Sequence, residues 1–274
     1  MACYGEVNSP NTVIFGKGEA FYNRINGEKK NMKKIIRTFI LLVSAALFAC
    51  ALCSCSLSGD YYRYDNANLY TAGGATLSAE NIRSIDIDWI GGSITVSPSS
   101  SDKIAFSEKT EETDENYLLH YAVIGGELKI KFQKSGVTNK QNFSKKLTIE
   151  LPESVVFTEI DLDSVAGDIS VRSGRANALK VDSVSGDVYV SPAVSDFIEI
   201  DVVTGNVVVE AEEERGYRVR FDSVTGTVFN PVHAEMTKVG DDTFYTYGDG
   251  AVAIEVDIVT GRLSLVPPSA ESAA

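Results

Sequence analysis

The sequence predicts an all-β protein, a parallel β-solenoid or β-helix-like stack of coils. Three observations predict it: a phrase Asp-x-Val-x-Gly recurs, most of its copies are about 20 residues apart, and the segments on either side alternate between apolar and polar residues. A fixed period of about 20 residues is typical of a solenoid. The repeat-corner residues are Asp163 and Gly167, Asp182 and Gly186, Asp201 and Gly205, Asp222 and Gly226, and Asp257 and Gly261.

One coil can be followed in the first full copy. Ile160 and Leu162 alternate with aspartates, and the alternation resumes after Gly167. Period-two alternation indicates half-buried strands, and it breaks at Ser164, where we expect the chain to turn a corner. The glycine supplies a backbone conformation that other residues adopt at a cost. We expect the valines of the phrase to line up as neighbours inside one body: Val165, Val184, Val203 and Val224.

The residues two positions before each aspartate test the register. They are Asp161, Lys180, Glu199, Arg220 and Glu255. Neighbouring coils should lie about 4.8 Å apart and pair in parallel. If the coils stack in chain order, opposite charges face one another, which supports the register more than the stability.

The N-terminal part has the features of an exported protein. Residues 1–31 are non-periodic and precede a fresh start at Met32, so we interpret them as a mis-assigned leader; a genuine long leader is the alternative. Residues 32–55 predict a signal peptide, with a basic start and an apolar run too short for a spanning helix. Its end, Leu52-Cys53-Ser54-Cys55, resembles the bacterial lipobox, and this implies cleavage before Cys55 and its diacylation; Cys50 matches less well. An uncleaved signal anchor is the rival interpretation, and both place the domain outside the cytoplasm.

The remaining chain divides into three parts. Residues 56–81 predict a flexible tether, 82–266 the β-solenoid domain, and 267–274 a disordered tail. Within the domain, 82–157 is less regular, contains a weak early copy of the phrase at Asp88, and should cap the first regular coil. Hairpins are expected about Gly125-Gly126 and within 229–252.

Composition excludes several functions. The formal net charge of −13 argues against nucleic-acid binding. No cysteine follows Cys55, so the domain has no disulfide or thiolate metal site. The two histidines, His120 and His233, have no catalytic partner nearby in sequence, and nucleotide-binding and zinc-protease motifs are absent. We therefore expect no catalytic residues and no enzyme.

Two surface features are candidate sites. The column of corner aspartates could bind Ca²⁺, which prefers several oxygen ligands; the alternative is that each aspartate caps its own corner. On the outward face of the second strand of each coil, we expect an apolar interaction stripe that contains Tyr189, Val208 and Phe229. This stripe is either exposed, as at an interface, or covered by another part of the chain.

The repeats, with Pro152-Glu153 and the early Gly91-Gly92-Ser93-Ile94 segment, resemble the bacterial family of candidate adhesins with β-strand repeats, domain of unknown function 4097. The resemblance covers roughly residues 80–266 and carries no catalytic residues. Together with the lipobox, it leads us to expect a lipid-anchored, non-catalytic surface scaffold or adhesin-like module that binds a protein or glycan. The alternatives are an envelope-stress or signalling lipoprotein that binds a membrane partner, and a β-helical polysaccharide-active enzyme.

Overall fold

The computed structural model describes residues 61–139, 144–172, 175–191, 195–211 and 215–267. The predicted leader, signal peptide, Cys55 and nearly all of the tail lie outside these residues. The chain divides into two compact units, Met1–Ser58 and Gly59–Ala274, and the description concerns the second. Among the described residues, no helix has the length and apolar character needed to cross a membrane.

The second unit is nearly all β, as predicted. Its irregular first part contains β1 (Tyr61–Tyr62), the 3₁₀ turn η1 (Ala67–Leu69), β2 (Thr71–Ala72), β3 (Ala75–Ser78), β4 (Ser84–Gly91), β5 (Ile94–Ser99), β6 (Lys103–Lys109), η2 (Glu115–Tyr117), β7 (His120–Ile124), β8 (Glu127–Lys131), β9 (Val137–Thr138) and β10 (Lys146–Pro152). The repeat region contains β11 (Phe157–Ala166), β12 (Ile169–Val171), β13 (Ala176–Ser185), β14 (Val188–Val190), β15 (Ser195–Thr204), β16 (Val207–Glu210), β17 (Tyr217–Phe229), β18 (Glu235–Val239), β19 (Asp242–Tyr247) and β20 (Val252–Val266).

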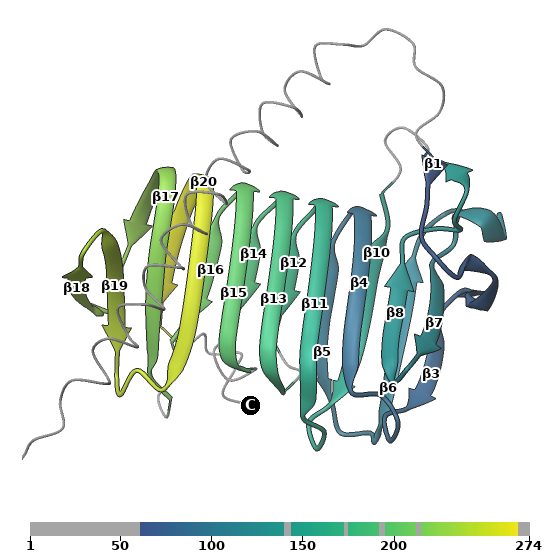
Figure 1. Ribbon diagram of the computed structural model, residues 1–274, viewed down its shortest axis with the longest axis horizontal. Helices are drawn as coiled ribbons and strands as arrows, with labels where there is room; N and C mark the ends of the chain where they lie inside the picture. The colour runs from purple at the N-terminus through teal and green to yellow at the C-terminus, as the bar shows by residue number, and fades with distance from the viewer. Residues whose placement is uncertain (1–60, 140–143, 173–174, 192–194, 212–214, 268–274) are drawn as a thin grey trace, which may run out of the picture. The chain divides into compact units, whose positions relative to one another are not determined.

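The coils form two layers of parallel strands (Figure 1). We call the layer made by β8, β4, β11, β13, β15 and the first halves of β20 and β17 the front sheet. The back sheet contains β3, β6, β10, β5, β12, β14, β16 and the second halves of β20 and β17. Each coil thus contributes one strand to each layer, which confirms the predicted solenoid-like stack.

Aliphatic side chains from both layers fill the space between them. In one coil, Ile160 and Leu162 of the front sheet and Ile169 and Val171 of the back sheet are all at most 1% exposed. The same positions are apolar in the neighbouring coils, so the rows merge into one core. Burying each such side chain contributes about 1.5–3 kcal/mol, and the core is built without a disulfide.

The predicted corner lies too early in the chain. β11 continues through Ser164 to Ala166, and Ser164 takes the next inward position and is buried. The period of two therefore turns Val165 outward, where it is 51% exposed. The valines of the phrase do stack in register, but the prediction that they lie inside the body is wrong because they follow an inward residue.

The last coil does not stack in chain order. β20 pairs with β15 on one side and with β17 on the other, so it is inserted between them. The antiparallel strands β18 and β19 return the chain for this insertion, as the predicted hairpin allows. Glu199 consequently faces Glu255, and the expected alternation of charge fails there. β20 buries four aliphatic residues in its first half, whereas the matching inward positions of β17 include the half-buried Phe221 and Ser223, so the strand with the more apolar inward face takes the interior place.

The irregular region extends the stack at its other end. β4 and β5 pair with β11 and β12 in the register of a further coil, with Asp88 opposite Asp163, as the weak early phrase predicts. The expected hairpin about Gly125-Gly126 is β7 and β8. The expected tether is wrong over residues 61–81, because β2 and β3 pair with β7 and β6. Tyr62, Tyr64 and Tyr70 of this segment pack on one another: the Tyr62 and Tyr64 rings meet edge-on at 5.6 Å, and the Tyr64 and Tyr70 rings lie 4.6 Å apart.

Candidate functional site

The outer face of the front sheet carries an unbroken column of aspartates. The strand register brings together Asp88, Asp163, Asp182, Asp201, Asp257 and Asp222, in this order, and we call this column the carboxylate ladder. Adjacent members are one strand apart, about 4.8 Å. Beside it, two residues earlier, runs a second charged column that contains Asp86, Asp161, Lys180, Glu199, Glu255 and Arg220.

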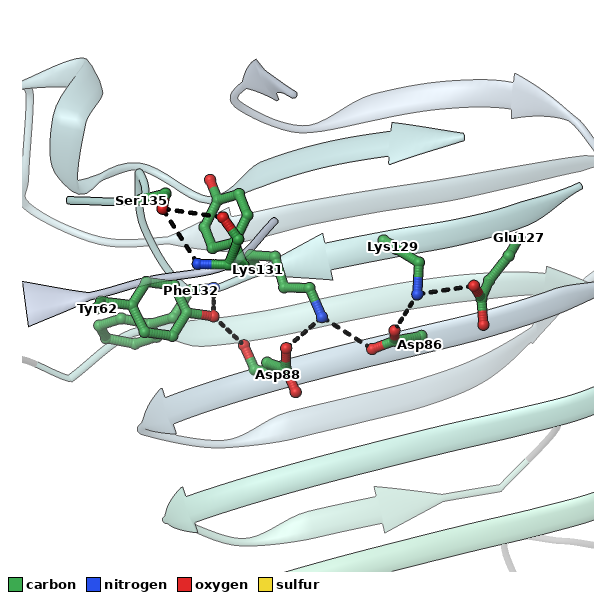
Figure 2. A network of polar contacts seen from close by, with 9 residues as sticks. Tyr62, Asp86, Asp88, Glu127, Lys129, Lys131, Phe132 and Ser135 are labelled. Carbon is green, nitrogen blue, oxygen red and sulfur yellow. Dashed lines mark hydrogen bonds and ion pairs between the residues drawn. The ribbon is translucent and has the colours of Figure 1, made fainter. Parts of the chain in front are cut away.

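Lysines neutralise one end of the ladder (Figure 2). Lys131, whose side chain is 7% exposed, bridges Asp86 at 3.0 Å and also pairs with Asp88. Lys129 contacts Asp86 at 2.6 Å and Glu127 at 2.7 Å. Burial alone would raise the pKa of Asp86, but the two lysines hold it below its ordinary value. The Tyr62 hydroxyl donates to the backbone oxygen of Asp88 and so fixes this end of the strand.

Arg220 neutralises the other end. Its guanidinium lies 2.8 Å from Glu255 and 3.3 Å from Asp257 and is nearly buried. Burial would lower the pKa of Arg220, but these carboxylates raise it. These contacts follow from the pairing of β20 with β17, which places both acids on the strand next to Arg220.

The middle of the ladder has an excess of negative charge. Lys180, which lies in the neighbouring charged column, forms an ion pair with Glu159 at 2.8 Å. Partial burial between strands, together with the neighbouring carboxylates, raises the pKa of both Asp163 and Asp201 to about 7. The same causes raise the pKa of Asp161 to about 6. The central acids therefore bind protons at a pH at which isolated carboxyls are ionised.

This arrangement predicts a pH-dependent stability. The folded chain holds protons on these carboxyls at a pH where the unfolded chain has lost them, so it binds more protons between about pH 4 and pH 7. The free energy of unfolding contributed by these groups should therefore fall as the pH rises through that window. We expect urea denaturation to give a higher midpoint at about pH 5 than at about pH 8, and Asp201→Asn to reduce that difference. Asp241→Asn, an exposed acid away from the ladder, is the control and should leave the difference unchanged; an equal effect of both substitutions would contradict the assignment.

The ladder also provides the geometry on which the calcium alternative depends. Carboxylate oxygens of Asp161, Asp163 and Asp182 lie within 4.8 Å of one another. They reach any cation from one side of a flat sheet, whereas Ca²⁺ takes six to eight oxygens. Calcium binding stays an untested prediction.

Corner capping is performed by other aspartates than those predicted. The carboxylate of Asp168 accepts the backbone N–H of Asp187 in the next coil at 3.0 Å, and Asp187 in turn accepts the N–H of Asn206 at 2.8 Å. The aspartate that follows the glycine therefore caps, and it links successive coils rather than its own. The earlier aspartate of the phrase faces outward on the front sheet.

The corner glycines are explained by close contact between coils. They form a column, and a Cβ added to one glycine would collide with the carbonyl oxygen of the glycine before it in the stack. A Cβ on Gly186 would lie 2.1 Å from the oxygen of Gly167. Gly167, Gly186, Gly205 and Gly261 stack in this manner, whereas a Cβ on Gly92 would lie 2.1 Å from the oxygen of Lys145. Gly226 lies opposite Gly261, within the continuous strand β17.

The predicted apolar stripe on the back sheet is interrupted. Tyr189 and Val208 are opposite one another, and both are half-buried. Because β20 is inserted, Ser264 separates Val208 from Phe229, which is 52% exposed. Arg172 stacks on the Tyr189 ring at 4.6 Å. A binding role for these residues stays a prediction.

The histidines lie apart from the ladder. His120 is 6% exposed, its Nδ1 is 3.0 Å from the oxygen of Leu118, and burial lowers its pKa. His233 is exposed in the turn before β18. The described residues also line a shallow groove of about 570 Å³ on the outside of β3, β6 and β10, where Glu150 is the one titratable side chain.

One buried feature has no signal in the sequence. Lys145 and Glu108 form an ion pair at 2.7 Å, and their side chains are 0% and 5% exposed. The Lys145 ammonium also donates to the oxygens of Tyr117 and Phe132. Burial lowers the pKa of Lys145, although the neighbouring Glu108 carboxylate acts in the opposite direction. The pair lies beside Trp89, at the capping end of the core.

Comparison with known proteins agrees with this fold. Residues 152–265 match the family model described as Toastrack DUF4097. A solved structure of a candidate cell adhesion protein from Clostridium sporogenes is similar over 72% of this chain and 100% of its own, with 17% identity and a TM-score of 0.52. A candidate adhesin from Bacteroides fragilis aligns over 72% of this chain and 97% of its own, with 12% identity and a TM-score of 0.35. No curated protein sequence matches the chain.

Proposed function

We propose that this chain, in which residues 152–265 are a Toastrack domain of the DUF4097 family, is a non-catalytic, adhesin-like binding protein of the bacterial cell surface. The observation that carries the proposal is the front sheet, whose outer face repeats the same side-chain rows over six adjacent strands. Flat, regularly repeated surfaces favour extended protein or glycan partners. The description of the Clostridium sporogenes protein as a candidate cell adhesion protein points the same way.

The chemistry of the face also favours binding over catalysis. Its titratable groups are rows at regular spacing rather than a nucleophile, a base and a third orienting group at one point. Acids at both ends of the ladder are engaged by Lys131 and Arg220. Retention at the surface would come from the lipid at Cys55 that the lipobox implies.

Attachment of whole cells tests this function. Bacteria that express the full chain should attach to immobilised envelope proteins or glycans more than cells without it. Cys55→Ala should lower attachment, because Cys55 is the expected site of both cleavage and lipidation and the chain should then be neither cleaved nor lipidated at the lipobox.

Two results would contradict the proposal. Unchanged attachment when the full chain is displayed and accessible to protease would remove the adhesin role. Release of sugars from wall polysaccharide by the purified chain would favour the polysaccharide-active alternative. Capture of one membrane protein without any attachment phenotype would favour the signalling lipoprotein.

A further inference from the structure

A row of branched aliphatic side chains lies on the outer face of the front sheet, next to the carboxylate ladder. The register aligns Ile90, Val165, Val184, Val203, Val259 and Val224, which we call the aliphatic row. Val165 and Val224 are 51% and 60% exposed, and the other members are half-buried. Single exposed valines are common on protein surfaces, but one on each of six adjacent strands makes a continuous apolar strip about 24 Å long.

The strip and the ladder are fixed relative to one another. In each strand the aliphatic residue follows the aspartate by two positions, so both side chains point outward from the same strand. An apolar strip bordered by polar residues marks an interaction surface. Here the border on one side is acidic along its whole length.

Above about pH 7, where Asp163 and Asp201 lose their protons, the central carboxylates have negative charge left to engage a partner. Lys131 and Arg220 are held by acids at the two ends, and Lys180 contacts Glu159. Asp163, Asp182 and Asp201 therefore lie together at the middle of the face, beside Val165, Val184 and Val203. A cationic partner would relieve the repulsion among these three carboxylates, whereas an anionic partner would increase it.

We propose that the aliphatic row and the carboxylate ladder together form a docking surface for a basic polypeptide segment of another protein. Aliphatic side chains of the segment lie on the valines, and its lysine or arginine side chains reach the carboxylates. Charge complementarity selects this occupant over a membrane, because anionic headgroups would meet the aspartates. The inference deepens the proposed function by giving the chemical class of the partner, and it rests on that function only in treating the chain as a binding protein.

Peptides of defined pattern test the surface directly. The purified full chain in mild detergent is titrated into three fluorescein-labelled peptides of equal length, which alternate lysine with valine, lysine with serine, or glutamate with valine. We expect the lysine–valine peptide to bind, the lysine–serine peptide to bind at least about tenfold more weakly, and the glutamate–valine peptide not to bind. Fluorescence anisotropy at low and high salt measures the affinities, and binding should weaken as salt rises.

Variants of the aliphatic row separate docking from general charge attraction. Threonine preserves the branched shape and the strand propensity of valine. The test variant combines Val165→Thr, Val184→Thr and Val203→Thr. Its matched control combines three other exposed valines, Val123→Thr, Val156→Thr and Val239→Thr. The test variant should lose about tenfold in affinity for the lysine–valine peptide, and the control less than twofold.

Variants of the carboxylate ladder test the contribution of charge to peptide binding. The test variant combines Asp163→Asn, Asp182→Asn and Asp201→Asn. The control replaces three carboxyl groups elsewhere, with Asp102→Asn, Glu153→Gln and Asp241→Asn, and these residues are all exposed. The test variant should bind at least about tenfold more weakly and show a smaller salt dependence than the control. Circular dichroism and urea midpoints establish that each variant is folded.

Several outcomes would overturn the docking surface. These are equal binding of the lysine–valine and lysine–serine peptides, equal losses in test and control variants, or no binding by the folded chain. Binding to anionic or neutral lipid vesicles that depends on the valines, without peptide binding, would replace it with a lipid surface. Cell attachment that persists while peptide binding fails would overturn this surface alone, and peptide binding without attachment would overturn the adhesin role alone.

Discussion

Replacing Lys145 with methionine should destabilise the domain by about 3–5 kcal/mol. The substitution leaves the carboxylate of Glu108 buried without its cation, and removing one partner of a buried ion pair has costs of this size. It also removes the donor to the oxygens of Tyr117 and Phe132. Equilibrium urea denaturation of Lys145→Met and of the unmodified chain measures the loss.

Two comparisons make this expectation specific. Lys146→Met changes the neighbouring lysine, which is exposed, and should shift the free energy of unfolding by less than about 0.5 kcal/mol. Adding Glu108→Gln to Lys145→Met should recover at least about 2 kcal/mol, because the glutamine is neutral and its oxygen can still accept the Leu119 N–H. A double variant as unstable as the single one would show that the buried charge is not the cause.

The ion pair between Lys145 and Glu108 could not be predicted from the sequence. The local sequence around Lys145 reads as a polar entry to the strand of 146–152, and Glu108 lies in a separate strand with its own alternation. Their contact depends on how the capping strands fold over Trp89, whose indole N–H donates to the Lys145 oxygen at 3.2 Å. No periodicity in either segment encodes that placement.

The repeat region was predictable because its rule is local. Spacing and alternation identify the coils, the inward Ile160 and Leu162, and the column of aspartates. The side of the sheet on which Val165 lies depends on whether the alternation continues past Ser164. It does continue, but the inward position is occupied by a polar serine, so the apolar pattern of the sequence breaks there. The candidate docking surface therefore emerged only from the structure.

The order of coils could not be predicted from the repeat itself. Equal phrases at 201, 222 and 257 allow either stacking order, because each can pair in parallel with the others. The long interval between the last two phrases holds β18 and β19, whose return path lets β20 enter between β15 and β17. That one insertion breaks the predicted charge alternation and the predicted stripe, because it separates Arg220 from Glu199 and Phe229 from Val208.

The largest effect on the stack itself is expected for Gly186→Ala, a loss of about 3 kcal/mol or more. Gly186 has φ of 140°, and an added Cβ would lie 2.1 Å from the oxygen of Gly167. The obstacle is backbone, so no side chain can move aside. The two coils would have to separate at a corner where the N–H of Gly167 donates to the oxygen of Ser185 at 2.8 Å. Overpacking with such a backbone shift belongs to the upper range of single-substitution effects.

Gly240→Ala is the matched control, since it separates the contact between coils from the intrinsic preference of glycine. Gly240 has φ of 65°, and nothing lies within 4 Å of its Cβ position. Its substitution should therefore cost only the strain of a left-handed alanine, about 1–2 kcal/mol. Urea midpoints of the two variants give the difference directly. If Gly186→Ala lowers the free energy of unfolding no more than Gly240→Ala does, the repeated glycine reflects turn geometry alone. The spacing of the aspartate and valine rows would then depend on strand pairing rather than on backbone contact at the corners.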